Sequence, residues 1–177
     1  MGRTSTRRGE IVARSAELFA ERGYGSVSLE DISTSLGFTK AGVYYHFKRK
    51  QELLAAIVEP LLEDSDRVLE DNAGDSAAIL TAYVDVVARH RVAYRVLLSD
   101  VAAVMATDLG TRIRAAHDHN VAALVGSSRS VMARVRADAA LAVARSLAGW
   151  TLDGHDTAPV RAEIVAACLR VLGKPAG

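Results

Sequence analysis

The sequence predicts an all-α protein, and three observations support this fold class. The chain of 177 residues is rich in Ala, Leu, Val and Arg and contains only three prolines. In one segment after another, apolar residues recur at the three- to four-residue spacing that marks one face of a helix. No stretch shows the sustained alternation with β-branched residues that is typical of a half-buried strand. We therefore expect helices throughout.

The first expected helix starts near Arg7, after a loose arm at residues 1–6, and ends at Gly23 and Gly25. Its apolar residues lie at helical spacing and predict a core-facing stripe: Ile11, Val12, Ala16, Leu18 and Phe19. Arg3, Arg7 and Arg8 could contact a DNA backbone or minor groove, or this end of the chain could be a frayed, solvated terminus.

Ser28 is expected to start a second helix, because Ser28 and Asp31 match a capping box. Ile32 and Leu36 follow on one face, and Gly37 can adopt the left-handed conformation that ends a helix. Free N–H groups at the start of this helix could bind a phosphate. Ser28 is therefore either a simple cap or a cap that also contacts DNA.

A third helix is expected directly after this glycine. Thr39 should cap it, so that Gly37 and Thr39 form the corner of a helix-turn-helix. At 100° per residue, Val43 and Phe47 share the inner side. The other side chains form an outward face with two flanks: Ala41, Gly42 and Tyr45 point outward, and Lys40, Tyr44 and His46 lie beside them.

The outward face predicts a DNA-reading surface. Small side chains would let the backbone approach base edges, whereas tyrosine hydroxyls, an imidazole and the cations of residues 48–50 could reach phosphates. For these residues alone, an amphipathic helix with a solvated basic end is the alternative. The charge distribution supports DNA binding: residues 1–50 carry a net charge of +4, and residues 51–177 carry −3.

The order of short helices, glycine turn, aromatic and basic segment, and long helix resembles the DNA-binding domain of the tetracycline-repressor (TetR) family. The likeness covers about residues 7–55 and is carried by residues 16–24, 28–37 and 39–54. In that family the third helix lies in the major groove. The resemblance therefore implies a DNA surface that includes the cap Thr39, with Lys40, Ala41, Gly42 and Tyr45 facing bases and Ser28, Tyr44, His46 and Lys50 holding phosphates.

Two residues depart from the family pattern. Gly42 stands where a member often has a side chain that contacts a base, so this position offers close backbone approach and little side-chain readout. It also lowers helix propensity by roughly 1 kcal/mol relative to alanine. Glu30 stands where some members present a cation, and its carboxylate would repel phosphate or accept from cytosine.

A long helix is expected from Lys50 to about Asp71, with Pro60 inside it. A proline there removes a backbone hydrogen bond and bends the helix, and the bend could transmit motion or simply be tolerated. We place the domain boundary at the start of this helix. Residues 1–49 would form the helix-turn-helix DNA-binding domain, and residues 50–177 a helical effector-binding and dimerisation domain.

The remaining pattern predicts further helices. Asp75 or Ser76 should cap one of them, and an apolar segment at residues 92–105 is expected to lie in the core. Three more helices are expected at residues 107–125, 130–152 and 157–172. In the TetR family the last two long helices pair with those of a second subunit in a four-helix bundle. The pattern here permits such a homodimer, but an intramolecular core would look much the same.

One polar residue interrupts the apolar face of residues 107–125. Asn120 lies at its centre beside His117, and a buried amide needs hydrogen-bond partners. Its partner is either a neighbouring helix or a ligand in a cavity. The candidate cavity-facing groups are Tyr83, His117, Asn120 and Trp150. So few polar groups suit a small, largely apolar molecule.

Other classes of protein find little support. The sequence has no G-x-S-x-G elbow, no G-x-x-x-x-G-K-[ST] loop, no G-x-G-x-x-G turn and no H-E-x-x-H, so we expect no enzyme and no cofactor. His117 and His119 would face different sides of one helix, which argues against a shared metal ion. No apolar run approaches the roughly twenty residues of a membrane span, and the N-terminus lacks an apolar signal segment, so we expect a cytoplasmic protein.

We therefore predict a homodimeric transcriptional regulator that binds double-stranded DNA at a pseudo-palindromic operator. We expect a repressor that a small-molecule effector releases from DNA. Two alternatives stay open. One is a helical protein-interaction module without an operator, and the other is a DNA-binding regulator without an effector.

Overall fold

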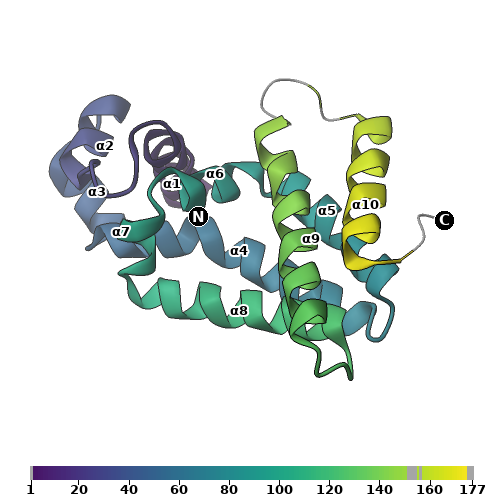
Figure 1. The fold of residues 1–177 in the computed structure, drawn as a ribbon. Helices are drawn as coiled ribbons and strands as arrows, with labels where there is room; N and C mark the ends of the chain where they lie inside the picture. Colours follow the sequence, from purple (N-terminus) through teal and green to yellow (C-terminus); the bar gives the residue numbers. More distant parts are fainter. Residues whose placement is uncertain (1, 151–154, 156, 175–177) are drawn as a thin grey trace. The chain divides into compact units, whose positions relative to one another are not determined.

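The computed structural model describes residues 2–150, 155 and 157–174, and the side chains of these residues except 2–5 and 148–150. All regular structure in the described residues is helical, which confirms the predicted fold class (Figure 1). The helices are α1 (Gly2–Arg22), α2 (Leu29–Leu36), α3 (Lys40–His46), α4 (Lys50–Asp71), α5 (Ser76–Arg89), α6 (Arg91–Ser99), α7 (Val101–Met105), α8 (Asp108–Val125), α9 (Val131–Trp150) and α10 (Ala158–Leu172).

Packing divides the chain into two compact units. The first unit contains Met1–Pro60 and Arg95–Thr111, and the second contains Leu61–Tyr94 and Arg112–Gly177. The division therefore falls inside α4, α6 and α8, so three helices connect the units along the chain. The predicted domain boundary between residues 49 and 50 is a functional division, and it stays a prediction.

Helix α1 starts earlier than expected. It begins at Gly2, not near Arg7, so the prediction of a loose arm is wrong for residues 2–6. The pattern missed these turns because they carry no apolar stripe. The next residues are anchored by cation–π contacts, since the Arg7 guanidinium lies 5.9 Å from the Phe38 ring centroid and that of Arg8 lies 4.9 Å from the Phe47 centroid.

The core of the first unit joins α1, α2 and α3 to the start of α4. Its completely buried side chains include Ile11, Phe19, Ile32, Val43, Phe47 and Leu53. The ring of Phe19 packs edge-on against Tyr24, with centroids 5.2 Å apart. Because Val43 and Phe47 are held in this core, the opposite face of α3 is directed to solvent.

The core of the second unit lies between α5, α9 and α10. Figure 1 shows α9 and α10 side by side and antiparallel, with α5 behind them, and all three helices contact one another. Alanines at the buried face of α9 let the neighbouring helices approach closely: Ala137, Ala140 and Ala144. Cys168 of α10 is buried as expected, and its Sγ donates to the Ala140 carbonyl.

The apolar segment at residues 92–105 is not wholly core. It breaks at Asp100 into α6 and α7, and Val92, Leu98 and Val101 are exposed. The break follows from the short polar side chain of Asp100, whose Oδ1 accepts from the Ala103 N–H at 3.2 Å and so caps α7.

No helix in the described part of the chain is long and apolar enough to cross a membrane.

Candidate DNA-binding surface

The start of α2 has the capping box expected from the sequence. The Ser28 hydroxyl accepts from the Asp31 N–H at 3.1 Å, and the Ser28 N–H donates to Asp31 Oδ2 at 2.7 Å. Hydrogen bonds from the side chain and then the backbone of Ser28 lower the pKa of Asp31. Ser28 is thus fixed and exposed at the first turn, where it was predicted to contact a phosphate.

The turn between α2 and α3 fixes the orientation of α3. Gly37 has φ 65°, which is the left-handed region that glycine adopts without strain, and the following N–H of Phe38 donates to the Ser33 carbonyl at 2.9 Å. Thr39 then accepts from the Gly42 N–H at 3.1 Å and caps α3. The corner of the helix-turn-helix is therefore held by local hydrogen bonds.

Helix α3 directs its apolar and polar sides as the rotation of the helix predicts. Val43 and Phe47 are buried, whereas Ala41 is exposed and Tyr45 retains 72 % of its surface. Gly42 and His46 are half-buried, and the His46 ring packs edge-on against Tyr45 at 5.1 Å. The outward face is small at Ala41 and Gly42 and aromatic at Tyr45. Its contacts with DNA stay a prediction.

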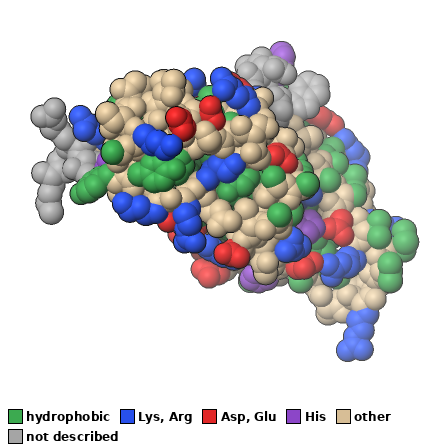
Figure 2. Space-filling view, turned by 90° about the vertical axis from the view of Figure 1, so that its left-hand side faces the viewer, with side chains coloured by type: hydrophobic (Ala, Val, Ile, Leu, Met, Phe, Trp, Pro, Cys, Tyr) green, Lys and Arg blue, Asp and Glu red, His purple; other side chains and the backbone are tan. Residues whose placement is uncertain are grey.

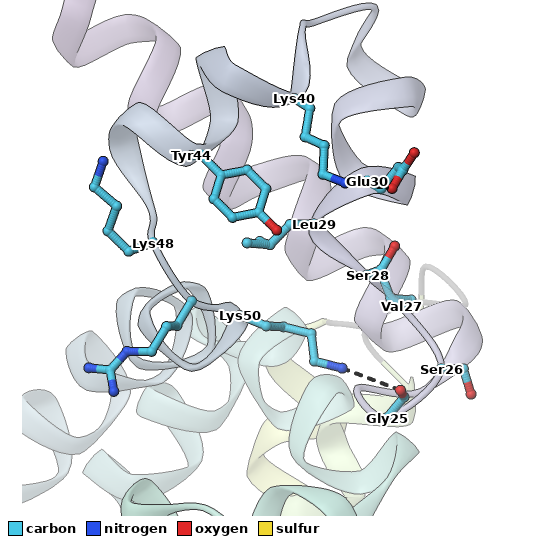
Figure 3. A pocket seen from close by; sticks show the side chains of 11 residues that line it. Gly25, Ser26, Val27, Ser28, Leu29, Glu30, Lys40, Tyr44, Lys48 and Lys50 are labelled. Carbon is cyan, nitrogen blue, oxygen red and sulfur yellow. Dashed lines mark hydrogen bonds and ion pairs between the residues drawn. The ribbon is translucent and has the colours of Figure 1, made fainter.

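A hollow next to α3 is bordered by three helix starts (Figure 3). Its lining consists of residues 25–30, Lys40, Tyr44 and residues 48–50. Figure 3 shows Tyr44 directed into this hollow between α3 and the start of α2. Serine hydroxyls, a tyrosine hydroxyl and cations in one concave surface form a suitable set of groups for a phosphate backbone.

One cation of this surface is paired within the protein. Lys40 Nζ lies 2.9 Å from Glu30 Oε2, and both side chains are largely exposed. The hydrogen bond and the charge of Glu30 raise the pKa of Lys40. The sequence did not reveal this pair because its members are ten residues apart on different helices. The predicted contact between Lys40 and a base would require Lys40 to leave or share Glu30.

Lys50 has a structural role that the sequence did not indicate. Its Nζ donates to the Tyr24 carbonyl at 2.7 Å and to the Gly25 carbonyl at 3.3 Å, and it lies 4.4 Å from the Tyr24 ring centroid. Burial lowers the pKa of Lys50, and the nearby carboxylates of Asp100 and Asp31 oppose that shift. Figure 3 shows the side chain directed toward Gly25 along the wall of the hollow.

The other basic residues of this surface are also close to acidic groups. Arg49 Nε lies 3.5 Å from Glu52 Oε1, and the other oxygen of Glu52 accepts from the Lys48 N–H at 2.8 Å. Figure 2 shows the side of the molecule that carries α2 and α3, where Lys and Arg side chains are scattered among apolar and acidic ones. The surface is basic in patches and is not a continuous block of positive charge.

The residues predicted for an effector pocket have partners inside the second unit. Asn120 is buried, and its Nδ2 donates to Ser65 Oγ at 3.0 Å and to the Ala116 carbonyl at 2.8 Å. His117 Nε2 lies 2.7 Å from Asp138 Oδ1. The Tyr94 hydroxyl donates to that of Tyr83 at 2.8 Å. The Trp150 side chain lies outside the described residues, so the effector role of this set stays a prediction.

Known proteins match the N-terminal part of the chain in sequence. Residues 11–57 match the family profile described as bacterial regulatory proteins, tetR family. The HTH-type transcriptional repressor KstR2 of Mycobacterium tuberculosis is 32 % identical over 62 residues, which is 35 % of this chain and 31 % of that protein. IcaR of Staphylococcus epidermidis, a negative transcriptional regulator of the biofilm operon icaADBC, is 40 % identical over 50 residues, or 28 % of this chain and 27 % of that protein.

Solved structures extend the likeness to the whole fold. AmtR of Mycobacterium smegmatis has 26 % identity and a TM-score of 0.66, covering 94 % of this chain and 86 % of that one. A TetR-like transcriptional regulator of Rhodococcus sp. RHA1 has 20 % identity and a TM-score of 0.69, covering 94 % and 96 %. In sequence, the chain spans about a third of the length of the curated relatives it matches.

Proposed function

We propose that this chain, whose residues 11–57 match the profile described as bacterial regulatory proteins, tetR family, is a dimeric repressor that binds operator DNA. The observation that carries the proposal is the outward face of α3. The core holds Val43 and Phe47, so Ala41, Gly42 and Tyr45 are presented together to solvent. A short helix with this face fits a major groove, where small residues allow close approach and the tyrosine reads base edges.

The hollow beside α3 supplies the backbone contacts. Ser28 at the start of α2, Tyr44 on α3 and Lys48 just before α4 border it. They would hold phosphates on either side of the bases that Ala41 and Tyr45 face. Phosphate contacts fix the register of a protein on DNA, whereas base contacts give the sequence preference.

Salt dependence tests the electrostatic part of the proposal. A duplex from the region upstream of its own gene, containing a pseudo-palindrome, is titrated by fluorescence anisotropy at several salt concentrations. Affinity should fall steeply with salt, because phosphate contacts release counterions. Lys48→Ala should weaken operator and unrelated duplexes about equally and lower the salt slope by about one. Equal affinity at low and high salt would contradict this proposal, and no binding to any duplex would favour a protein-interaction module.

The proposed second subunit would pack on α9 and α10. Helix α9 buries one face inside its own unit, yet Met132 and Val135 on another face retain 58 % and 51 % of their surface. Ala139 and Ala142 continue this exposed face toward the C-terminal end of the helix. A two-fold dimer would cover these residues and present two α3 helices to two half-sites.

A charge on this face tests the dimer. Ala142→Arg adds a bulky cation to an exposed position, so it should leave the monomer folded but lower both the mass in sedimentation velocity and the operator affinity. Val131→Arg, at the exposed start of α9, is a matched control that reports how far the interface extends. An unchanged dimer in the Ala142→Arg protein would place the interface elsewhere.

We also propose that a small, largely apolar molecule releases the repressor. Such an effector must bind the DNA-incompetent conformation better than the competent one, since equal affinity for both shifts no population. A compound that raises the melting temperature should therefore also release operator DNA. A compound that stabilises the protein and leaves operator affinity unchanged would not be an effector.

A further inference from the structure

The backbone of Gly25, in the turn between α1 and α2, is held by hydrogen bonds at both its N–H and its carbonyl. Its N–H donates to Asp100 Oδ2 at 2.8 Å, and its carbonyl accepts from Lys50 Nζ at 3.3 Å. Lys50 also holds the preceding carbonyl of Tyr24 at 2.7 Å and lies against the Tyr24 ring. These groups all belong to the first unit. The turn is thus bound to the start of α4 and to the junction between α6 and α7.

Asp100 is itself fixed in place. Its second oxygen caps α7 by accepting from the Ala103 N–H, and the neighbouring Ser99 hydroxyl donates to the Phe19 carbonyl at 2.8 Å. Two consecutive residues therefore bind the last turn of α1 and the turn that follows it. Neither lies in the segment matched by the family profile, which ends at residue 57.

The close contact with Asp100 leaves little room for a side chain at residue 25. Gly25 is not among the glycines with positive φ, so its backbone conformation is open to other residues. A Cβ at this position would lie 2.7 Å from Asp100 Oδ2, closer than real Cβ contacts allow. The Asp100 carboxylate therefore occupies the space that a side chain at residue 25 would need.

We propose that Asp100 is a positioning residue for DNA binding. By holding the Gly25 peptide, it sets the turn that leads into Ser28 at the start of α2. Through Lys50, the same turn is tied to the start of α4. Ser28 and Lys50 both border the hollow beside α3. Asp100 would therefore set the spacing between groups that are proposed to contact the DNA backbone, although Asp100 itself would not touch DNA. This inference rests on the proposed function.

The test separates this role from helix capping. Asp100→Ser keeps a side chain that caps α7, but the serine hydroxyl is too short to hold the Gly25 N–H as well. Asp75→Ser is the matched control, because Asp75 caps α5 in the second unit with bonds to the N–H groups of Ala77 and Ala78. Full-length proteins are compared at a temperature where circular dichroism shows each to be folded.

Operator affinity should fall about tenfold in Asp100→Ser and stay within twofold of wild type in Asp75→Ser. Affinity for an unrelated duplex should change by less than threefold in both, because the cations of the surface are retained. A variant that is less stable but still folded should bind operator DNA and unrelated DNA with the same affinity ratio as wild type. A fall in that ratio therefore points to positioning and not to stability.

A double-mutant cycle tests the contact itself. Gly25→Ala alone should weaken operator binding by at least tenfold, because its Cβ collides with the carboxylate. The same change in the Asp100→Ser background should add less than twofold, since the shorter side chain leaves room. Additive losses, or Asp100→Ser with unchanged operator affinity, would overturn the inference while leaving the proposed function intact. If the wild-type protein prefers no duplex over another, the proposed function fails and this inference fails with it.

Discussion

The polar side chains that cap the helices around α3 and those buried inside the second unit have different roles. Around α3, the polar groups that shape the backbone bond within three residues, as in Ser28 with Asp31 and Thr39 with Gly42, and Tyr45 remains directed to solvent. In the second unit, polar groups join helices that are distant in the chain, as in Ser65 with Asn120. The first arrangement leaves side chains available for a partner, and the second uses them to align helices.

This difference predicts where substitutions will act. A buried donor or acceptor that loses its partner lowers stability by about 1–3 kcal/mol, whereas an exposed side chain away from such features changes stability by about 0.5 kcal/mol or less. Changes in the second unit should therefore alter the free energy of unfolding, and changes on the face of α3 should alter DNA affinity alone.

The largest effect is expected at Asn120. Asn120→Leu should lower the free energy of unfolding by about 2 kcal/mol, because Ser65 loses its partner inside the unit. The melting temperature should fall by roughly 4–8 °C in thermal denaturation. Ser65→Ala combined with Asn120→Leu should recover part of the loss, since neither position then strands a polar group. An unchanged melting temperature with loss of effector binding would instead make Asn120 a ligand anchor and break the comparison.

Acid should reveal the next largest effect, at Asp64. Hydrogen bonds from His90 Nε2 at 2.9 Å and Arg89 at 2.7 Å lower the pKa of Asp64 from 3.8 to about 2, and its side chain is only 16 % exposed. A folded-state pKa below the unfolded value stabilises the protein above about pH 4, and this stability is lost as the pH falls toward 2. We expect a loss of about 1–2 kcal/mol in this range.

Urea unfolding at pH 2 to 5 in low salt measures this loss. Asp64→Asn should already be less stable at pH 7 by a similar amount and should lack this part of the acid dependence. Asp66→Asn is the control on the same helix, because its carboxylate is exposed and lies 4.0 Å from His119. If the free energy of unfolding of both variants depends on pH as that of wild type does, the contacts of Asp64 with Arg89 and His90 do not stabilise the fold.

Tyr45 tests the exposed face of α3 in the first unit. Tyr45→Ala should weaken operator binding about fivefold, or roughly 1 kcal/mol, and narrow the gap between operator and shuffled duplexes in competition assays. The melting temperature should stay within about 1 °C, because the side chain is exposed. Tyr45→Phe separates the hydroxyl from the ring. A large fall in melting temperature would show that the fold uses this face.

The smallest effect is expected at Glu30. Glu30→Gln frees Lys40 from its ion pair and removes a negative charge beside α3, so affinity for unrelated DNA should rise two- to threefold, or roughly 0.5 kcal/mol. Stability should be unchanged, since exposed pairs contribute little. Asp66→Asn weakens a similarly exposed pair with His119 in the second unit, away from α9 and α10, and should leave DNA binding unchanged. Equal salt slopes for Glu30→Gln and wild type would show that the pair does not affect DNA binding.

The sequence predicted best what short-range interactions determine. The caps Ser28 and Thr39 are predicted because each bonds to a backbone N–H three residues away. Asp75 is one of two candidate caps in the sequence, and the structure selects it over Ser76. The helical period of α3 likewise predicted which side chains face the core, although their contacts with DNA remain predictions.

Interactions between distant residues gave no signal in the sequence. The sequence around Glu30 does not indicate that it pairs with Lys40. Likewise, the sequence around Gly25 does not indicate its bond to Asp100, which lies 75 residues away. The apolar residues at 92–105 look alike in sequence, but Val104 is buried and Leu98 is exposed, because packing from elsewhere in the chain decides between them. For Asn120 the sequence left two partners open, and only the fold brings Ser65 to it.

The discontinuous first unit has a consequence for how such a protein can be recombined. A chimera that takes only residues 1–60 would carry all of the family-matched segment but would lack Ser99 and Asp100. The Gly25 N–H would then lose its carboxylate, and the Phe19 carbonyl would lose the Ser99 hydroxyl. On the proposed function, a transplantable DNA-binding module of this chain would therefore need two segments, residues 1–60 and 95–111.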